Sequence, residues 1–237
     1  MKINTDLVKN KKFAKDIQPQ TLKHSQEYRV LATLRYLYPQ EFNTVIPGES
    51  PDLQDYVNGV GIEVTASVTE NDMRAMRSFS RLHQENSRDV HEHLRRIADS
   101  GYTLNHFGNN RFSISRPGTA DGEKAIFQQS IQRKIEKLQR YRENFRILGL
   151  AIILPDPPTS YAESHYKEWI SELADENNIF FDFIFVISNR FCIRFGIHEN
   201  TVEKLPLTAT EKETLAIIGR LTAEGKLSLN DAEWSID

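Results

Sequence analysis

The chain contains 237 residues, of which 39% are hydrophobic and 27% are charged, and its net charge is −3. This apolar content excludes a disordered chain, and the length allows one large domain or two small ones with a sizeable core. No run approaches the roughly 18 apolar residues of a membrane helix, and the start lacks the apolar segment of a signal peptide. The single cysteine, Cys192, excludes an internal disulfide and a multi-cysteine zinc site. We therefore expect a cytoplasmic protein without membrane contact.

The small net charge hides an uneven distribution along the chain. Residues 1–38 carry eight Lys or Arg against three Asp or Glu, whereas residues 155–237 carry seven against fifteen. A basic first part suits a polyanion such as a nucleic acid. Arginine-rich helices that simply face solvent explain the same pattern equally well.

The first predicted elements are a basic arm, a helix and a short strand. Residues 1–20 show no clear periodicity and read as the arm. Residues 23–38 predict a helix that is ended by Pro39, and a short strand is expected at 44–46. Glu27 lies on the apolar face of the predicted helix, which is unusual for a carboxylate.

The next segment predicts a β-hairpin, because Asn58-Gly59 between two apolar runs is the strongest short hairpin signal. With these two residues at the centre of the turn, side-chain alternation places four polar residues on one face. They are Asp52, Gln54, Glu63 and Thr65. Asp55 falls on the opposite, apolar face, and this misfit indicates a bulge or an edge position.

The remaining elements alternate between helices and strands. Residues 71–99 predict two helices, residues 101–121 a loop or irregular hairpin, and residues 123–143 one helix. The others are a buried strand at 147–154, a helix at 161–177, strands at 179–187 and 191–196, and a helix that begins at Thr210 with a capping box completed by Glu213. This order predicts an α/β protein, with a mixed sheet and helices on its faces, in a single domain over residues 1–237.

Asp52 and Glu63 form the arrangement that points to chemistry. In the expected register they are diagonal neighbours, with Cβ atoms about 7 Å apart or less. Two carboxylates at this separation repel each other beside apolar packing, and a divalent cation relieves the repulsion. A cation held in this way, with open positions for phosphate oxygens and water, fits hydrolysis of a phosphodiester. A nearby lysine would stabilise the charge of the transition state.

Three features together resemble the PD-(D/E)xK nuclease superfamily: the pair Pro51-Asp52, the eleven-residue step to Glu63, and the segment Gly-Ile-Glu-Val-Thr at 61–65. The order of the superfamily core, α-β-β-β-α-β, is similar to that of residues 23–154. The resemblance thus implies a restriction-endonuclease-like core with a helical insertion, followed by an acidic C-terminal α/β extension over 155–237. It also implies a Mg²⁺- or Mn²⁺-dependent nuclease that acts on DNA, as restriction or phage-defence enzymes do.

The resemblance further implies roles for individual residues. Asp52 and Glu63 would bind the metal, together with the carbonyl of Val64 and with Glu27, which superfamily enzymes often carry on the first helix. Thr65 stands where the superfamily has lysine, and the sequence resembles bacterial members that lack this lysine. Lys134, from the helix at 123–143, would replace it, with Lys137 as the second choice.

Several basic or aromatic residues are expected to contact the nucleic acid, through the phosphate backbone or from the helix at 123–143. They are Arg74, Arg77, Arg81, Arg133 and Tyr141. Cleavage of both DNA strands would favour a symmetric homodimer.

Simpler explanations exist for each of the proposed site residues. Asp52 after proline is typical of a turn or strand start, and Glu63 fits the solvated face of an antiparallel strand. Glu27 can form an ion pair with Lys23 or Arg29, and lysines on a helix often face solvent. Two other functions therefore stay open: a nucleic-acid-binding protein that lost the chemistry with Thr65, and a non-enzymatic protein whose acidic C-terminal third binds a basic partner.

Overall fold

The computed structural model describes residues 2–3, 19–82, 89–106, 112–116, 118–154, 158–230 and 234–235. The chain divides into two compact units, one made of Met1–Ala66 with Ser130–Asp237 and the other of Ser67–Gln129. The sequence predicted a single domain, with a helical insertion in its core. The insertion instead forms a unit of its own, because it has a separate apolar core around Ala75, Ile97 and Tyr102.

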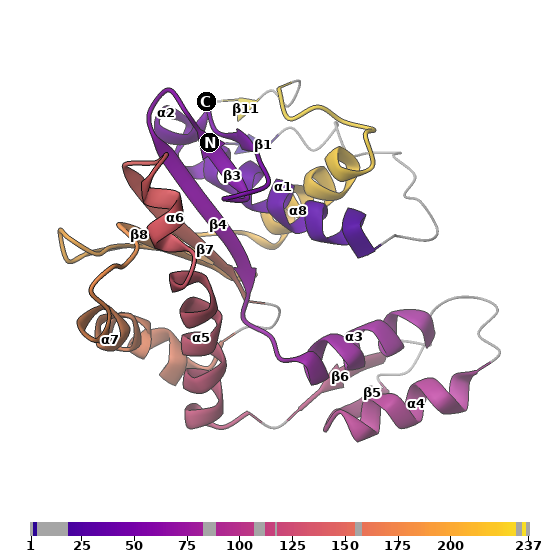
Figure 1. Cartoon of the computed structure of the whole chain (residues 1–237). Coiled ribbons are helices and arrows are strands. Elements are labelled where there is room, and N and C mark those ends of the chain that lie inside the picture. Colours follow the sequence, from indigo (N-terminus) through magenta and orange to yellow (C-terminus); the bar gives the residue numbers. More distant parts are fainter. Residues whose placement is uncertain are drawn as a thin grey trace. The chain divides into compact units, whose positions relative to one another are not determined.

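A seven-stranded mixed sheet is the centre of the larger unit (Figure 1), and its strand order is β10-β9-β8-β7-β4-β3-β2. The strands are β2 (Ile46–Pro47), β3 (Leu53–Asp55), β4 (Val60–Ala66), β7 (Ile147–Ile153), β8 (Phe183–Ile187), β9 (Phe191–Gly196) and β10 (Thr201–Pro206). β4, β7 and β8 run parallel, and the other neighbours are antiparallel. The mixed α/β class expected from the sequence is confirmed.

Helices cover both faces of this sheet. Figure 1 shows α1 (Pro19–Leu37) and α8 (Ala209–Ala223) together on one face, with α6 (Leu138–Arg142) and α7 (Ser160–Glu176) on the other. Every second strand residue packs toward α1 and α8, which places Ile62 and Val64 of β4 in that core. Glu63, between them, therefore points to the opposite face. A short helix, α2 (Pro39–Phe42), follows α1.

Helices α1 and α8 approach each other closely at Gly219. A Cβ atom at this position would lie 2.7 Å from the backbone nitrogen of Arg29 and 2.8 Å from the carbonyl oxygen of Ser25. Such contacts are too short for real side chains, so the packing of α8 against the first half of α1 requires a glycine.

The β3–β4 hairpin differs from the predicted register by two residues. Leu53 pairs with Ile62 and Asp55 with Val60, so the loop has four residues instead of two. The cause is Asp55, whose buried carboxylate accepts hydrogen bonds from the Thr44 hydroxyl and from backbone and side-chain groups of the loop. Because the shift is even, every side chain keeps its predicted face.

Several element boundaries also differ from the prediction. The helix expected at 123–143 is broken into α5 (Ala120–Ile135) and α6. The capping box of α8 is made by Thr208 and Glu211, two residues before the expected pair. Strand β10 was not predicted, and residues 1–20 lie outside the described residues except for β1 (Lys2–Ile3), which pairs with β11 (Trp234–Ser235), and the first residues of α1.

The smaller unit contains the helices α3 (Glu70–Leu82) and α4 (Val90–Asp99) and a hairpin of β5 (Thr103–His106) and β6 (Phe112–Ser115). It also includes the first part of α5, as far as Gln129. The two helices were predicted, and the hairpin is one of the two alternatives, a loop or an irregular hairpin, expected from the sequence. Asp72 joins its elements, because its buried carboxylate accepts a hydrogen bond from Tyr102 and pairs with Arg116 at 2.7 Å.

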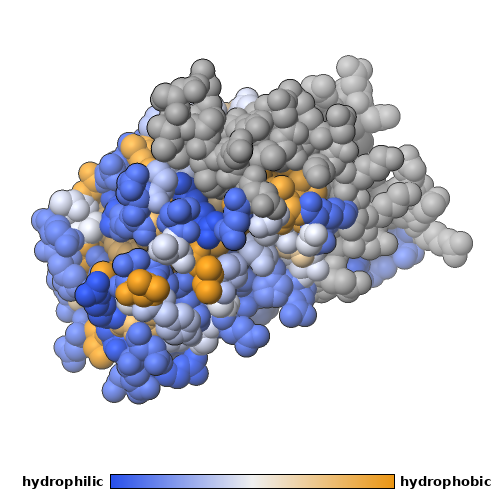
Figure 2. Space-filling model, turned by 90° about the horizontal axis from the view of Figure 1, so that it is seen from above, coloured by the Kyte–Doolittle hydropathy of each residue, from blue (hydrophilic) through white to orange (hydrophobic). Residues whose placement is uncertain are grey.

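Figure 2 shows one face of the protein, on which small separate groups of apolar residues lie among hydrophilic side chains. This mixture is ordinary for the outside of a folded protein. Among the residues that the structure describes, no helix has both the length and the apolar character needed to cross a bilayer.

Asp182, just before β8, anchors α6 and β7 to the rest of the sheet. Its Oδ2 atom accepts the backbone N–H of Leu148 at 2.6 Å and pairs with Arg142 at 2.8 Å, and Oδ1 contacts His198. Burial alone would raise the pKa of Asp182, but these donors outweigh it and hold the pKa below its ordinary value. The resulting stabilisation is present above the unfolded-state pKa and is lost as the pH falls through the folded-state pKa.

We therefore expect Asp182→Asn to lower the thermal unfolding midpoint at pH 7, and this loss to shrink below the ordinary aspartate pKa of about 3.9. Calorimetry of both proteins between pH 7 and pH 3 measures the difference. Asp175→Asn, at an exposed position on α7, is the control. If Asp182→Asn lowers the unfolding midpoint by the same amount at pH 7 and pH 3, the charge of Asp182 does not stabilise the fold in the way described.

Candidate functional site

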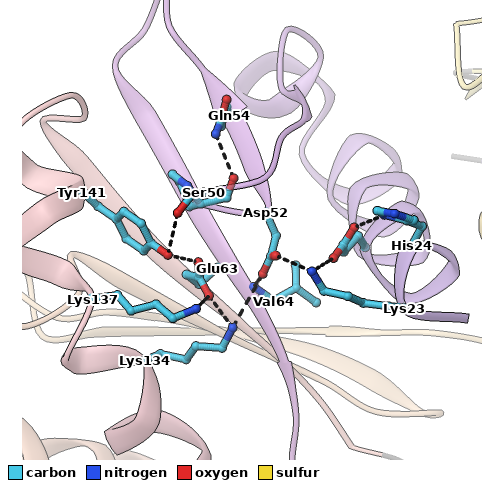
Figure 3. A network of polar contacts seen from close by, with 12 residues as sticks. Lys23, His24, Ser50, Asp52, Gln54, Glu63, Val64, Lys134, Lys137 and Tyr141 are labelled. Atoms are coloured by element: carbon cyan, nitrogen blue, oxygen red, sulfur yellow. Dashed lines mark hydrogen bonds and ion pairs between the residues drawn. The ribbon is translucent and has the colours of Figure 1, made fainter. Parts of the chain in front are cut away.

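Asp52 and Glu63 lie on the same face of the hairpin and are both buried, with 5% and 2% of their surfaces exposed. Continued by one step, the β3–β4 register places Asp52 opposite Glu63. The Lys134 ammonium contacts Glu63 Oε2 and lies 3.7 Å from Asp52 Oδ2 (Figure 3). The structure thus brings together the two acids and the lysine that the sequence singled out.

Three side chains on either side of the break between α5 and α6 contact Glu63. Lys134 comes from the last turn of α5, and Lys137 from the junction, where its ammonium lies 3.7 Å from Glu63 Oε2. Tyr141 of α6 donates a hydrogen bond from its hydroxyl to Glu63 Oε1. Leu138, fully buried beneath the junction, holds α6 in place. Both oxygens of Glu63 are therefore bound by side chains from this helical segment.

A short chain of hydrogen bonds orients the Tyr141 hydroxyl. Arg140 donates to Ser50 Oγ at 2.7 Å, and Ser50 Oγ contacts the Tyr141 hydroxyl at 3.3 Å. Ser50 lies two residues before Asp52, so this chain links α6 to the segment that carries the first acid.

Asp52 lies at the centre of the cluster and continues the sheet beyond the end of β3. Its Oδ2 atom accepts the backbone N–H of Val64 at 2.8 Å, a donor that β3 no longer reaches. Its Oδ1 atom faces the other way, toward the Lys23 ammonium at 3.6 Å. Because the N–H and C=O of one strand residue lie on the same edge of the strand, the Val64 carbonyl also lies on the Asp52 side of β4.

Glu27 enters the cluster from α1 and is 3% exposed. Its Oε2 atom lies 2.8 Å from His24 Nδ1, and its Oε1 atom lies 3.2 Å from the Lys23 ammonium. This Oε1 atom is buried and makes no hydrogen bond with the residues described. Lys23 therefore joins Glu27 to Asp52, and the ion pair between Lys23 and Glu27 anticipated from the sequence is present.

The two central acids differ in their affinity for protons. Burial and the neighbouring Glu63 raise the pKa of Asp52, although the Val64 N–H and Lys134 act in the opposite direction. Burial also favours protonation of Glu63, but contacts with Lys134, Tyr141 and Lys137 outweigh it and lower its pKa. Of the two, Asp52 therefore holds a proton more readily. Burial and the contact with Glu63 raise the pKa of Tyr141, which keeps this hydroxyl a donor.

The oxygen atoms of the cluster suit a hard divalent cation. Mg²⁺ is typically held by one or two carboxylates and keeps several waters, so Asp52, Glu63 and the Val64 carbonyl form an adequate ligand set. Glu27 Oε1, which is paired with Lys23 and accepts no hydrogen bond from the described residues, is a further oxygen ligand of the same kind. In the arrangement described, ammonium groups separate the carboxylates, and no three Asp, Glu, His or Cys side chains of the described residues converge on one point.

The residues expected to bind nucleic acid fall into two groups. Arg74, Arg77 and Arg81 are exposed on α3 of the smaller unit, and Arg133 is exposed on α5. Tyr141 is different, because only 3% of its surface is exposed and its hydroxyl is bound to Glu63. We therefore assign Tyr141 to the carboxylate cluster instead of the nucleic-acid surface.

Sequence reasoning missed two members of the cluster as site residues, His24 and Ser50, and treated Lys23 only as a neighbour of Glu27. The spacing of Lys23 and His24 before Glu27, four and three residues, places all three on one side of a helix. This signal was available once Glu27 was placed on the apolar face. Ser50 gave no such signal, since its contacts come from a distant helix.

Comparisons of the chain with protein-family models, with curated proteins and with solved structures give no match.

Proposed function

We propose that this protein is a metal-dependent nuclease that hydrolyses phosphodiester bonds of DNA. The observation that carries the proposal is the Asp52–Glu63 pair, buried on one face of a hairpin with the Lys134 ammonium in contact with Glu63 and 3.7 Å from Asp52. The two carboxylates lie close enough that burial and the charge of Glu63 raise the pKa of Asp52. Buried acids that shift each other's pKa in this way are typical of functional sites.

Each residue of the cluster has a role in this proposal. Asp52, Glu63 and the Val64 carbonyl would hold Mg²⁺ or Mn²⁺, with Glu27 as a further ligand. When bound, the cation would supply an activated water and would polarise the phosphoryl group. Lys134 would stabilise charge on the phosphate oxygens, with Lys137 beside it. Tyr141 orients Glu63 through its hydrogen bond, and Lys134, which is 17% exposed, is held in position by the same carboxylate.

The order of elements around the cluster supports the proposed relationship to PD-(D/E)xK nucleases. Helix α1, strands β2, β3 and β4, helix α5 and strand β7 follow one another in the order α-β-β-β-α-β, apart from the short helices α2 and α6 and the inserted unit. Asp52 and Glu63 fall at the hairpin of this series, and Lys134 falls on the helix after it. We propose that a restriction or phage-defence role, with cleavage by a homodimer, follows from this relationship.

A second function is favoured by one observation, the presence of Thr65 where the superfamily has lysine. A protein of this kind would bind nucleic acid without cutting it. The direct contact of Lys134 with Glu63 argues for the active enzyme, since it supplies an amine from another element.

We expect the wild-type protein to cleave DNA in Mg²⁺ or Mn²⁺ and not in EDTA. Asp52→Asn and Glu63→Gln should each abolish cleavage, because each removes a charged metal ligand. Lys134→Met should reduce the rate roughly 100-fold or more by removing a stabilising charge. A fluorescent-substrate assay with linear and plasmid DNA measures these rates.

Asp182→Asn is the matched control for these variants, since it neutralises a partly buried carboxylate of the same unit that lies outside the cluster. Its cleavage rate should stay within about twofold of the wild type at a temperature where both are folded. DNA binding without cleavage in any metal would favour the second function instead. Full activity of the Glu63→Gln protein would exclude the proposed site.

Helix α3 is the proposed contact for the DNA backbone. Arg74, Arg77 and Arg81 are exposed and, among the residues described, none is joined to an acid by an ion pair. Their spacing places them on one side of the helix. Exchanging all three for glutamine should weaken DNA binding. It should also reduce the steepness of the plot of log affinity against log salt concentration by about 2 to 3.

Fluorescence anisotropy with a labelled duplex at several salt concentrations measures this slope. The control removes the same charge elsewhere, with Lys167, Lys204 and Lys226 each changed to glutamine, and should leave the slope unchanged. Equal slopes for all three proteins would show that α3 does not contact the DNA.

A further inference from the structure

Lys23 occupies a distinct position in the cluster, between two carboxylate oxygens that come from different elements. Its ammonium lies 3.6 Å from Asp52 Oδ1, just before β3 (Figure 3). The same ammonium lies 3.2 Å from Glu27 Oε1 on α1. We propose that Lys23 is a displaceable internal cation, which keeps these two oxygens paired in the metal-free protein and gives them up when the divalent cation binds. This inference rests on the proposed metal site.

The other oxygen of each carboxylate is held by a different group. Glu27 Oε2 contacts His24 at 2.8 Å, and Asp52 Oδ2 accepts the backbone N–H of Val64 at 2.8 Å. When Lys23 leaves, both carboxylates therefore keep their orientation, and Glu27 Oε1 and Asp52 Oδ1 become available together. A pair of oriented carboxylate oxygens is the ligand type that Mg²⁺ and Mn²⁺ select.

Lys23 is also the member of the cluster that moves away most easily. Its side chain is 63% exposed, whereas that of Lys134 is 17% exposed. An exposed ammonium regains water when it leaves, so the loss of its ion pairs is small. A divalent cation attracts the same two oxygens more strongly, because its charge is twice as large and its ligands approach more closely.

The two lysines therefore have different roles. Lys134 contacts Glu63 and the opposite oxygen of Asp52, and because it is much less exposed than Lys23, it would stay in the site when the metal binds. Lys23 instead competes with the metal. The ion pairs of Lys23 hold the metal-free cluster together, and because the cation must displace Lys23, its apparent affinity is weaker.

Titration calorimetry of the full chain with Mn²⁺, in the absence of nucleic acid, tests the inference. Lys23→Met should bind Mn²⁺ about three- to tenfold more tightly than the wild type, because the competing charge is gone. Lys23→Arg keeps the charge and should stay within about twofold of the wild type. Circular dichroism establishes that each variant is folded.

Lys204→Met is the matched control. Lys204 is 48% exposed and pairs with Glu163, so this change removes an exposed lysine from an ion pair outside the cluster. Its Mn²⁺ affinity should equal that of the wild type. In a Glu27→Gln background, the gain from Lys23→Met should shrink, since one of the two shared oxygens then carries no charge.

The outcomes separate this inference from the proposed function. Wild-type binding of Mn²⁺ with unchanged or weaker binding by Lys23→Met would overturn the role of Lys23 and leave the metal site standing. Absence of Mn²⁺ binding by the wild type would overturn both. If Lys23→Met and Lys204→Met both bind Mn²⁺ more tightly to the same extent, the effect comes from the change in net charge, and the role of Lys23 is also overturned.

Discussion

The buried Glu63 carboxylate, on an interior strand of the sheet, requires that the helices packed beside it supply its partners. Glu63 lies on β4, between β3 and β7, with 2% of its surface exposed, so its charge must be compensated by nearby groups. Lys134 and Tyr141 supply that compensation from α5 and α6, and the break between these helices lets both reach it. Lys134 balances the charge of Glu63, and Tyr141 satisfies its second oxygen with a hydrogen bond.

The cluster as a whole is balanced in charge. Glu27, Asp52 and Glu63 are joined by ion pairs to three lysines, two of which bridge neighbouring acids. Each acid comes from a different segment, so the ion pairs also join α1 to the hairpin and the hairpin to α5. In this protein, the groups suited to chemistry are the same groups that hold the elements together.

Sequence reasoning found the parts of this arrangement that depend on side-chain alternation and helical periodicity. The faces of Asp52 and Glu63 survived an error of two residues in register, because only an odd shift changes faces. The register itself depended on hydrogen bonds of Asp55 with Thr44, a residue outside the hairpin. The helix break at 136–137 and the separate core of the inserted unit arise from tertiary packing, which periodicity does not report.

The close approach of α8 to α1 at Gly219 gives the acidic C-terminal region a place in this account. The two backbone groups that would meet a side chain there belong to Ser25 and Arg29, which flank Glu27 on the chain. The small size of residue 219 therefore sets how closely α8 can approach the part of α1 that carries Glu27. A larger residue there would force the backbones of the two helices apart, so the C-terminal region helps to position the first helix.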